Sequence, residues 1–229
     1  MSIGIIGYGV VGKAADNTFS KYYNTIKYDK YQDLDDFNSL LDCDFVFVMV
    51  PTPFDYDKNK VNQEAIIESL TRLEEIGFKN IVIIKSTVPP GSCSSYADQF
   101  NLRIVFNPEF LRESTTPNED FENQEIIVIG TDKVEDYNLV KHMYQKIAIS
   151  SAKYYHTTVN EAEMIKTAQN TMLASRVALA NVIFDACQEY HVSYSRLREI
   201  AFNNFDILGP HMVQVPGPDG DAESIFNQF

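Results

Sequence analysis

A glycine-rich turn close to the start of the chain constrains the fold more than any other feature. The turn Gly7-Tyr8-Gly9-Val10-Val11-Gly12 follows an apolar run, Ile3–Ile6, that predicts a buried strand, and it opens a predicted helix that ends at about Lys21. Strand, G-x-G-x-x-G turn and helix in this order are typical of a dinucleotide-binding unit. Gly7 permits the tight turn, Gly9 lets the backbone approach a pyrophosphate, and Gly12 allows close packing of helix on strand.

An acidic residue follows at the spacing that such a unit requires. Asp29 lies 22 residues after Gly7, at the end of a second predicted strand, Thr25–Tyr28. A carboxylate at this place binds the adenosine ribose hydroxyls and repels the 2′-phosphate of NADP. The sequence therefore predicts NAD as the cofactor. Lys30 is the neighbouring cation that could weaken this repulsion, and it is included in the predicted cofactor site.

Short apolar runs then alternate with amphipathic helical patterns. Phe45–Val50 is apolar on both faces, as a central parallel strand is, and Glu64–Ile76 has an apolar stripe at helical spacing. Further strands are predicted at Ile81–Ile84, Arg103–Phe106 and Glu125–Ile129, and further helices at Asp33–Leu41 and Asp132–Lys146. The alternation predicts an α/β fold of the Rossmann type, a doubly wound parallel sheet with helices on both faces.

A long helical segment follows the alternating part. Thr158 to about Tyr190 contains no glycine or proline, and its apolar positions form a stripe wider than one Rossmann domain can cover. We expect one long helix over 158–190 that also forms a homodimer interface. A shorter helix is predicted at Ser195–Phe202. The predicted domains are a cofactor domain over 1–156 and a helical region over 157–229.

Composition excludes several classes of protein. The net charge of -13 and the pI of about 4.7 argue against a nucleic-acid partner, and an anionic ligand would need local donors such as a helix N-terminus. The three cysteines form no CxxC pair, so we expect no disulfide framework, no metal site and a reducing, cytoplasmic location. No segment predicts a signal peptide or a membrane-spanning helix.

Four motifs in order resemble those of the UDP-glucose/GDP-mannose dehydrogenase family, the nucleotide-sugar 6-dehydrogenases. The resemblance covers about residues 3–205 and is carried by Val50–Pro53, Lys85–Gly91, Asn107–Glu113, and Ala162–Lys166 followed by Asn170. It implies a Rossmann domain, a long connecting helix that dimerises, and a C-terminal domain for the nucleotide. It also implies two NAD-dependent oxidations of a sugar C6 alcohol to a carboxylate, with UDP-glucose as the expected substrate.

The resemblance also assigns roles to single residues. It implies catalytic roles for Thr87, Glu109, Glu113, Lys166 and Asn170, and it adds Pro51, Thr52, Ser86, Thr87 and Glu113 to the cofactor site. Lys166 and Asn170 are four residues apart on one helix, so they could aim a cation and a donor at one developing oxyanion. The alternatives are a Thr87 that only closes a turn, glutamates at a solvated helix start, and an exposed helical face at Lys166 and Asn170.

The end of the sequence departs from the family pattern. The family places a nucleophilic cysteine in a glycine-rich segment soon after the long helix, whereas here Val213–Gly220 resembles only the approach to it. Neither Cys43, Cys93 nor Cys187 matches that position. Two hypotheses stand: a dehydrogenase completed by a C-terminal portion, or a non-catalytic NAD-binding dimerisation module. A dehydrogenase of the 6-phosphogluconate or 3-hydroxyacid type is the weaker third interpretation.

Overall fold

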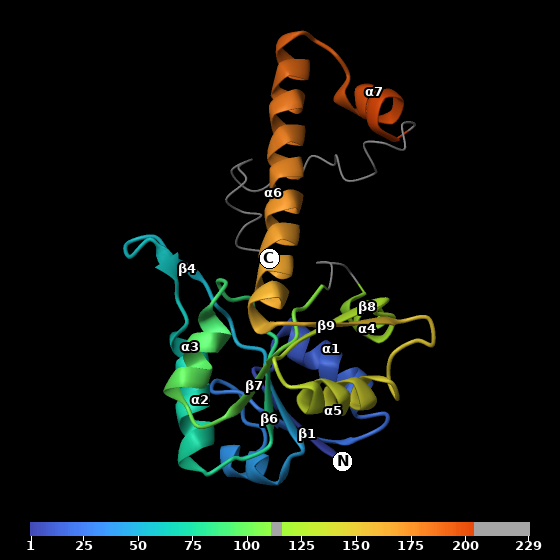
Figure 1. Cartoon of the computed structure of the whole chain (residues 1–229). Helices are drawn as coiled ribbons and strands as arrows, with labels where there is room; N and C mark the ends of the chain where they lie inside the picture. The colour runs from blue at the N-terminus through green and yellow to red at the C-terminus, as the bar shows by residue number, and fades with distance from the viewer. Residues whose placement is uncertain (111–115, 204–229) are drawn as a thin grey trace. The chain divides into compact units, whose positions relative to one another are not determined.

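A seven-stranded sheet forms the framework of the cofactor domain, with the strand order β2-β1-β3-β6-β7-β8-β9 (Figure 1). The computed structural model describes residues 1–110 and 116–203. The chain forms two compact units, Met1–Thr167 and a second that begins at Ala168, so their boundary lies within one helix. The predicted fold class, a mostly parallel Rossmann-type sheet followed by a long helix, is confirmed.

The strands of the sheet are short and mostly apolar. They are β1 (Ser2–Ile6), β2 (Asn24–Tyr28), β3 (Phe45–Val48), β6 (Ile81–Ile84), β7 (Arg103–Phe106), β8 (Ile126–Gly130) and β9 (Lys153–Thr157). The helices of this unit are α1 (Val10–Phe19), the 3-10 helix η1 (Phe37–Asp42), α2 (Glu64–Glu75), α3 (Ser92–Gln99), α4 (Pro117–Glu122), α5 (Val134–Tyr144) and the start of α6 (Val159–Glu189). A two-stranded hairpin, β4 (Phe54–Asp55) and β5 (Lys60–Val61), precedes α2.

The strand order creates one topological switch point. β1 pairs in parallel with both β2 and β3, so the chain leaves β1 toward one side of the sheet and later returns to the other. In open parallel sheets, ligands bind beyond the carboxyl ends of the strands at such a point. The segments after β1 and β3 therefore border the expected cofactor cleft.

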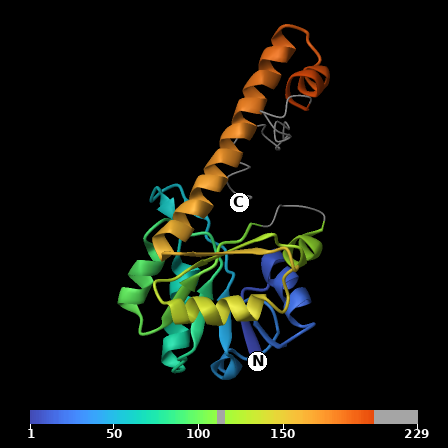
Figure 2. The same cartoon turned by 45° about the vertical axis from the view of Figure 1, so that its right-hand side comes forward.

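Side chains that alternate along the strands fill two core layers. Ile3 and Ile5 of β1 join a layer under α1, α4 and α5, whereas Ile6 joins the opposite layer under α2, α3 and η1. Figures 1 and 2 show these helices on the two faces of the sheet. The central strands β3 and β6 are apolar on both faces because helices cover both faces of the sheet.

The structure adds elements that the sequence analysis did not predict and alters others. The hairpin β4–β5, α3, α4 and β9 were not expected, and the helix predicted at Asp33–Leu41 is the shorter 3-10 helix η1. β8 meets β7 in antiparallel orientation through one pair, Phe106 and Gly130, so the sheet is not wholly parallel. Gly130 also lies close to α6, since a side chain on Gly130 would come within 2.6 Å of the Ala162 Cβ atom.

Helix α6 begins with two carboxylates that anchor it. Thr158 and Glu161 form a capping box: the Glu161 carboxylate accepts hydrogen bonds from the Thr158 backbone N–H at 2.8 Å, and the Thr158 hydroxyl accepts one from the Glu161 N–H at 3.2 Å. Glu163 is fully buried and accepts hydrogen bonds from the Gly91 and Cys93 N–H groups at 2.6 and 2.8 Å, where α3 begins. These contacts fix the first turns of α6 to the cofactor domain.

The second unit is helical over its described part. It contains the remainder of α6, the helix α7 (Tyr194–Arg198) and a π-helical turn, Glu199–Asn203. Phe184 and Tyr194 meet edge to face with ring centroids 5.5 Å apart. Across the described ranges 1–110 and 116–203, no helix combines the length and the apolar character needed to span a membrane.

Candidate active site

The glycine turn after β1 has the geometry that a pyrophosphate needs. Gly7 has φ +93°, and a Cβ atom there would lie 2.4 Å from the Met49 carbonyl oxygen, whereas a Cβ on Gly12 would lie 2.1 Å from the Gly7 oxygen. A Cβ on Gly9 would meet nothing within 4 Å, so open space lies beside the N-cap of α1. Gly9 offers no side-chain cap and the first turn of α1 holds no acidic residue. The free N–H groups and the helix dipole therefore suit a bound anion.

Asp29 is held beside this turn at the end of β2. Its carboxylate accepts hydrogen bonds from the backbone N–H groups of Tyr8 at 2.8 Å and Tyr31 at 2.9 Å. Partial burial raises the pKa of Asp29, but these hydrogen bonds, one from Gln32 and the charge of Lys13 together lower it below its usual value. A fixed and ionised carboxylate at this place suits the ribose of NAD.

Lys30 does not direct its charge toward Asp29. Its Nζ atom lies 2.9 and 2.8 Å from the two carboxylate oxygens of Glu68, on α2. Both side chains are about half exposed to solvent. Because Lys30 is paired with Glu68, its positive charge is already balanced. It is therefore not expected to weaken the repulsion between Asp29 and the 2′-phosphate of NADP.

The ends of β3 and β6 are joined by side-chain hydrogen bonds. The Thr52 hydroxyl donates to the Thr87 carbonyl oxygen at 2.7 Å, and the Ser86 hydroxyl donates to the Val50 carbonyl oxygen at 2.7 Å. The predicted cofactor residues Thr52, Ser86 and Thr87, together with Pro51, thus lie at the carboxyl edge of the sheet. This edge is the one that also carries the glycine turn and Asp29.

A cluster of buried polar side chains lies next to this edge. The Nζ atom of Lys85 lies 2.9 Å from Glu109 Oε2 and 3.0 Å from Asn107 Oδ1. Asn107 also accepts a hydrogen bond from the Tyr144 hydroxyl at 2.6 Å and donates one to the Val128 carbonyl oxygen at 2.7 Å. Glu109 is a predicted catalytic residue, whereas Lys85 and Asn107 lie in the quoted motifs without a predicted role, because their contacts join residues more than twenty positions apart.

Lys166 reaches the same cluster from α6. It is 7% exposed, which rules out the exposed helical face that the sequence allowed, and its Nζ atom lies 5.7 Å from the centre of the Phe110 ring. Burial lowers the pKa of Lys166 to about 8, with the charge of Glu109 opposing and the charge of Lys85 adding to this shift. A lysine with such a pKa exchanges its proton close to neutral pH, as a general acid or base must.

Two of the predicted catalytic residues lie outside the described part of the first unit. Asn170 lies one turn further along α6 and belongs to the second unit. Glu113 lies outside the described residues. Glu109 is 7% exposed, so the alternative of a solvated helix start does not apply to it.

The three cysteines are buried and poorly suited to be nucleophiles. Burial, with Asp44 and Asp42 adding to it, raises the pKa of Cys43 to about 11, and burial beside Glu163 raises the pKa of Cys93 well above its usual value. Cys187 is also buried. No group of side chains in the described ranges is arranged to hold a metal ion.

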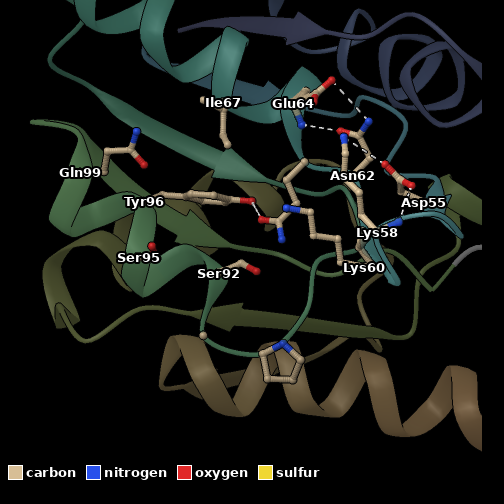
Figure 3. A pocket seen from close by; sticks show the side chains of 14 residues that line it. Asp55, Lys58, Lys60, Asn62, Glu64, Ile67, Ser92, Ser95, Tyr96 and Gln99 are labelled. Atoms are coloured by element: carbon tan, nitrogen blue, oxygen red, sulfur yellow. Dashed lines mark hydrogen bonds and ion pairs between the residues drawn. The ribbon is translucent and has the colours of Figure 1, made fainter.

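A cavity of about 460 Å³ lies elsewhere, between the β4–β5 hairpin and helix α3 (Figure 3). Its polar side chains are mostly bonded to one another: Lys58 pairs with Asp55 at 3.2 Å, and the Tyr96 hydroxyl bonds to Gln63. None of the predicted site residues lines this cavity. We therefore place the candidate active site at the carboxyl edge of the sheet.

Comparison with known proteins identifies the family of the chain. Residues 20–148 match the NAD binding domain of the UDP-glucose/GDP-mannose dehydrogenase family, and residues 160–221 match its central domain. The chain is 30% identical over 158 residues to a UDP-glucose 6-dehydrogenase from Rickettsia felis, which covers 66% of this chain and 35% of that protein. It is 29% identical over 190 residues to the UDP-glucose 6-dehydrogenase AglM of Haloferax volcanii, covering 75% of this chain and 43% of that protein.

Solved structures show the same fold. A UDP-glucose dehydrogenase from Pyrobaculum islandicum superposes with a TM-score of 0.81 at 20% identity, covering 98% of this chain and 62% of that one. A GDP-mannose dehydrogenase from Pseudomonas aeruginosa, solved as a ternary complex, has a TM-score of 0.72 at 24% identity and covers 87% of this chain and 56% of that one. The chain thus spans less than half the length of the two curated relatives. By its motifs, its fold and the two matched domains, with an NAD binding domain over most of the first unit, the chain belongs to the UDP-glucose/GDP-mannose dehydrogenase family.

Proposed function

We propose that this chain supplies the NAD-binding domain and part of the sugar site of a nucleotide-sugar 6-dehydrogenase, with UDP-glucose as its substrate. The observation that carries the proposal is the buried cluster of Lys85, Glu109 and Lys166 at the same sheet edge as the glycine turn and Asp29. A module that only binds a dinucleotide needs the turn and Asp29 but not two buried lysines.

The residues have distinct tasks in this proposal. The turn 7–12 and the start of α1 hold the pyrophosphate, and Asp29 holds the adenosine ribose. When bound, NAD accepts hydride from the sugar C6 carbon. Lys166 would supply the cation or base for the alcohol, and Asn170, one turn later on α6, would add a hydrogen-bond donor. Glu109 would bind a water molecule or hold the two lysines in place. Thr87 would contact the nicotinamide end of NAD, and the resemblance assigns Glu113 a role toward both NAD and the sugar.

We further propose a cytoplasmic homodimer built on α6. The helix exposes large apolar side chains, including Met172 at 58%, Leu179 at 53% and Val182 at 64%. Apolar surface of this extent along one helix usually marks an interface. A second copy of the chain is the partner that symmetry favours for soluble proteins.

Gly9 offers a sharp test of NAD binding. A Cβ there meets no protein atom within 4 Å and Gly9 has an ordinary φ of −79°, so Gly9→Val should leave the fold and melting temperature unchanged. It should abolish NAD binding in a calorimetric titration, because the side chain would fill the space for the pyrophosphate. Val134→Ala, at a position of α5 that is 62% exposed and lies outside the glycine turn, is the control and should bind NAD normally. Undiminished NAD binding by Gly9→Val would place the cofactor elsewhere.

Titration with UDP-glucose separates the two function hypotheses. NADH formation that depends on UDP-glucose, even if slow, and that disappears in Lys166→Met supports the dehydrogenase. NAD binding without any such NADH supports the non-catalytic module. Parallel titrations with GDP-mannose and UDP-N-acetyl sugars identify the nucleotide sugar.

A further inference from the structure

Lys85 is a lysine whose side chain is wholly enclosed by protein. It directly follows β6, its side chain is 0% exposed, and the Phe121 ring centre lies 5.4 Å from its Nζ atom. Its ion pair with Glu109 is therefore buried as well. Such a pair adds little net stability, because removing both charges from water offsets their attraction. Stability is thus a weak reason for a lysine at this position.

The Lys85–Glu109 pair is fixed by a rigid frame. Lys85 also bonds to Asn107, which is held in turn by the Tyr144 hydroxyl of α5 and the Val128 carbonyl of β8. Strands β6 and β8, the segment after β7, and helix α5 all contribute to this frame. Glu109 is consequently held at one place by side chains that have little freedom to move.

Lys166 presents the opposite case. It is also buried, yet among the described residues it forms no hydrogen bond or ion pair, and its contact there is with the Phe110 ring. A buried ammonium group is normally paired with a carboxylate. Glu109 is close enough for its charge to act on Lys166, but its ion pair is with Lys85.

We propose that Lys85 is a positioning residue: by holding the Glu109 carboxylate it keeps this group from pairing with Lys166, and so leaves the Lys166 amine for the substrate. Only the statement about the substrate rests on the proposed function. The positions of the Lys85, Glu109 and Lys166 charges are features of the protein without any ligand. When two buried lysines lie near one carboxylate, the lysine that is not paired with it has the lower pKa. The lowered pKa of Lys166, caused first by burial, agrees with this arrangement.

The other titratable groups around the cluster do not replace Lys85 in this role. On α5, burial raises the pKa of Tyr144 well above its usual value, so that hydroxyl stays neutral. On α6, Glu163 is occupied by the N–H groups of Gly91 and Cys93. The charges that face Lys166 in the described structure are therefore those of Glu109 and Lys85.

The proposal is tested by titrating Lys166 in the 229-residue chain, by NMR with ¹³C-labelled lysine Cε atoms. The signal of Lys166 is identified by its loss in Lys166→Arg. In Lys85→Met, Glu109 is released toward Lys166, and we expect the pKa of Lys166 to rise by at least about one unit, roughly tenfold in proton affinity. Lys85→Arg keeps the charge and the carboxylate partner, so its value should stay within ~0.5 unit of the unaltered protein. An unchanged pKa in folded Lys85→Met would overturn the proposal.

A second comparison covers the case that Lys85→Met does not fold, since it removes the lysine from a buried ion pair. Lys85→Met/Glu109→Gln replaces the pair by two neutral side chains of similar size. Glu109 is absent from both this double variant and Glu109→Gln alone, so removal of Lys85 can act on Lys166 only by removing one like charge. The pKa of Lys166 should therefore differ between the two variants by clearly less than the one unit expected for Lys85→Met. A rise of one unit or more in the double variant would show that Lys85 acts by direct repulsion, and it contradicts the proposal. Neither comparison requires NAD or a sugar, so loss of the proposed function would appear separately, as absent ligand binding.

Discussion

At the scale of single residues, we expect Asp29 to set the preference for NAD over NADP. Asp29→Ala removes the acceptor for the ribose hydroxyls and releases the Tyr8 and Tyr31 N–H groups. We expect the NAD affinity to fall by roughly 10- to 100-fold, the value of one hydrogen bond to a charged group. The ratio of NADP to NAD affinity should rise, as measured by calorimetry. Lys30→Ala is the control, because its charge is already paired with Glu68. Equal affinity of the unaltered protein for both cofactors would contradict the assignment.

Lys166 should make stability depend on pH in a defined direction. Its pKa is about 8 in the folded protein, against 10.5 for an unperturbed lysine, so between these pH values the unfolded chain binds more protons. Stability then rises with pH across this window, and the penalty of a buried ammonium is fully present below pH ~8. Lys166→Met should therefore be more stable near pH 7, by an amount on the order of 2 kcal/mol, with the difference shrinking toward pH ~10.5. Urea unfolding of both proteins at several pH values measures this, and a constant difference would refute it.

Single residues differ in how far the sequence reveals them. The glycines and Asp29 could be predicted because they act through backbone geometry and through spacing along one βαβ unit. Glu109 and Lys166 were predicted by resemblance alone, since nothing local distinguishes them from surface charges. The ion pair between Lys85 and Glu109 could not be predicted, because a lysine directly after a strand usually reaches solvent. The burial of Lys85 depends on Asn107 and Glu109, which are more than twenty residues away in the sequence.

At the scale of elements, Glu163 joins α6 to the start of α3. Because it is fully buried and accepts two backbone hydrogen bonds, Glu163→Ala leaves both N–H groups without acceptors and creates a cavity. We expect a loss of about 2–4 kcal/mol in the free energy of unfolding. Glu161→Ala removes the exposed carboxylate of the capping box and should lower the free energy of unfolding by clearly less than Glu163→Ala does. Chemical denaturation compares the two, and equal losses would show that Glu163 does not carry the anchor.

The elements that the sequence predicted are those with long or strongly apolar patterns. β3 and α6 are examples, and α6 was placed within one residue of its observed bounds, Val159–Glu189. Helix α3, with the sequence SCSSYADQ, has too many serines for a helical pattern to be visible, and it is stabilised by Glu163 from another element. Strand β9 mixes polar and aromatic residues and pairs only with β8, so it shows no clear period.

At the scale of the whole molecule, the fold class could be predicted because alternation of buried strands with helices leaves few arrangements. The strand order and the antiparallel contact of β8 could not, since they depend on contacts between residues far apart in the sequence, such as the Phe106–Gly130 pair. The edge to which we assign the cofactor follows more simply from the parallel strands. In a parallel sheet the segments after β1, β2, β3 and β6 all end at one side, whatever their lateral order.

The dimer proposal concerns the exposed apolar face of α6. Leu179→Glu and Val182→Glu together place two charges on it, and we expect them to convert a dimer to a monomer in light scattering at micromolar concentration, because buried charges without partners oppose association. Val134→Glu, at a position on α5 that is 62% exposed, is the matched control and should leave the mass unchanged. A monomeric unaltered protein, or a dimer that survives both substitutions on α6, would contradict an interface at this face.

The last prediction concerns what the 229-residue chain does when it is assayed alone. Oxidation of an alcohol to a carboxylate removes four electrons, and the family route holds the aldehyde on a thiolate between the two hydride transfers. Here Cys43 and Cys93 are buried with raised pKa values, and Cys187 is buried in the second unit, so none provides an accessible thiolate. We therefore expect NAD binding, with at most slow formation of one NADH per UDP-glucose, and no acid product. Simultaneous measurement of NADH and UDP-glucuronate decides the matter. Formation of two NADH per UDP-glucuronate at ~1 per second or faster would contradict this prediction and would mean that one of the three thiols reaches the sugar. Loss of that activity in Cys93→Ser would identify Cys93 as this thiol.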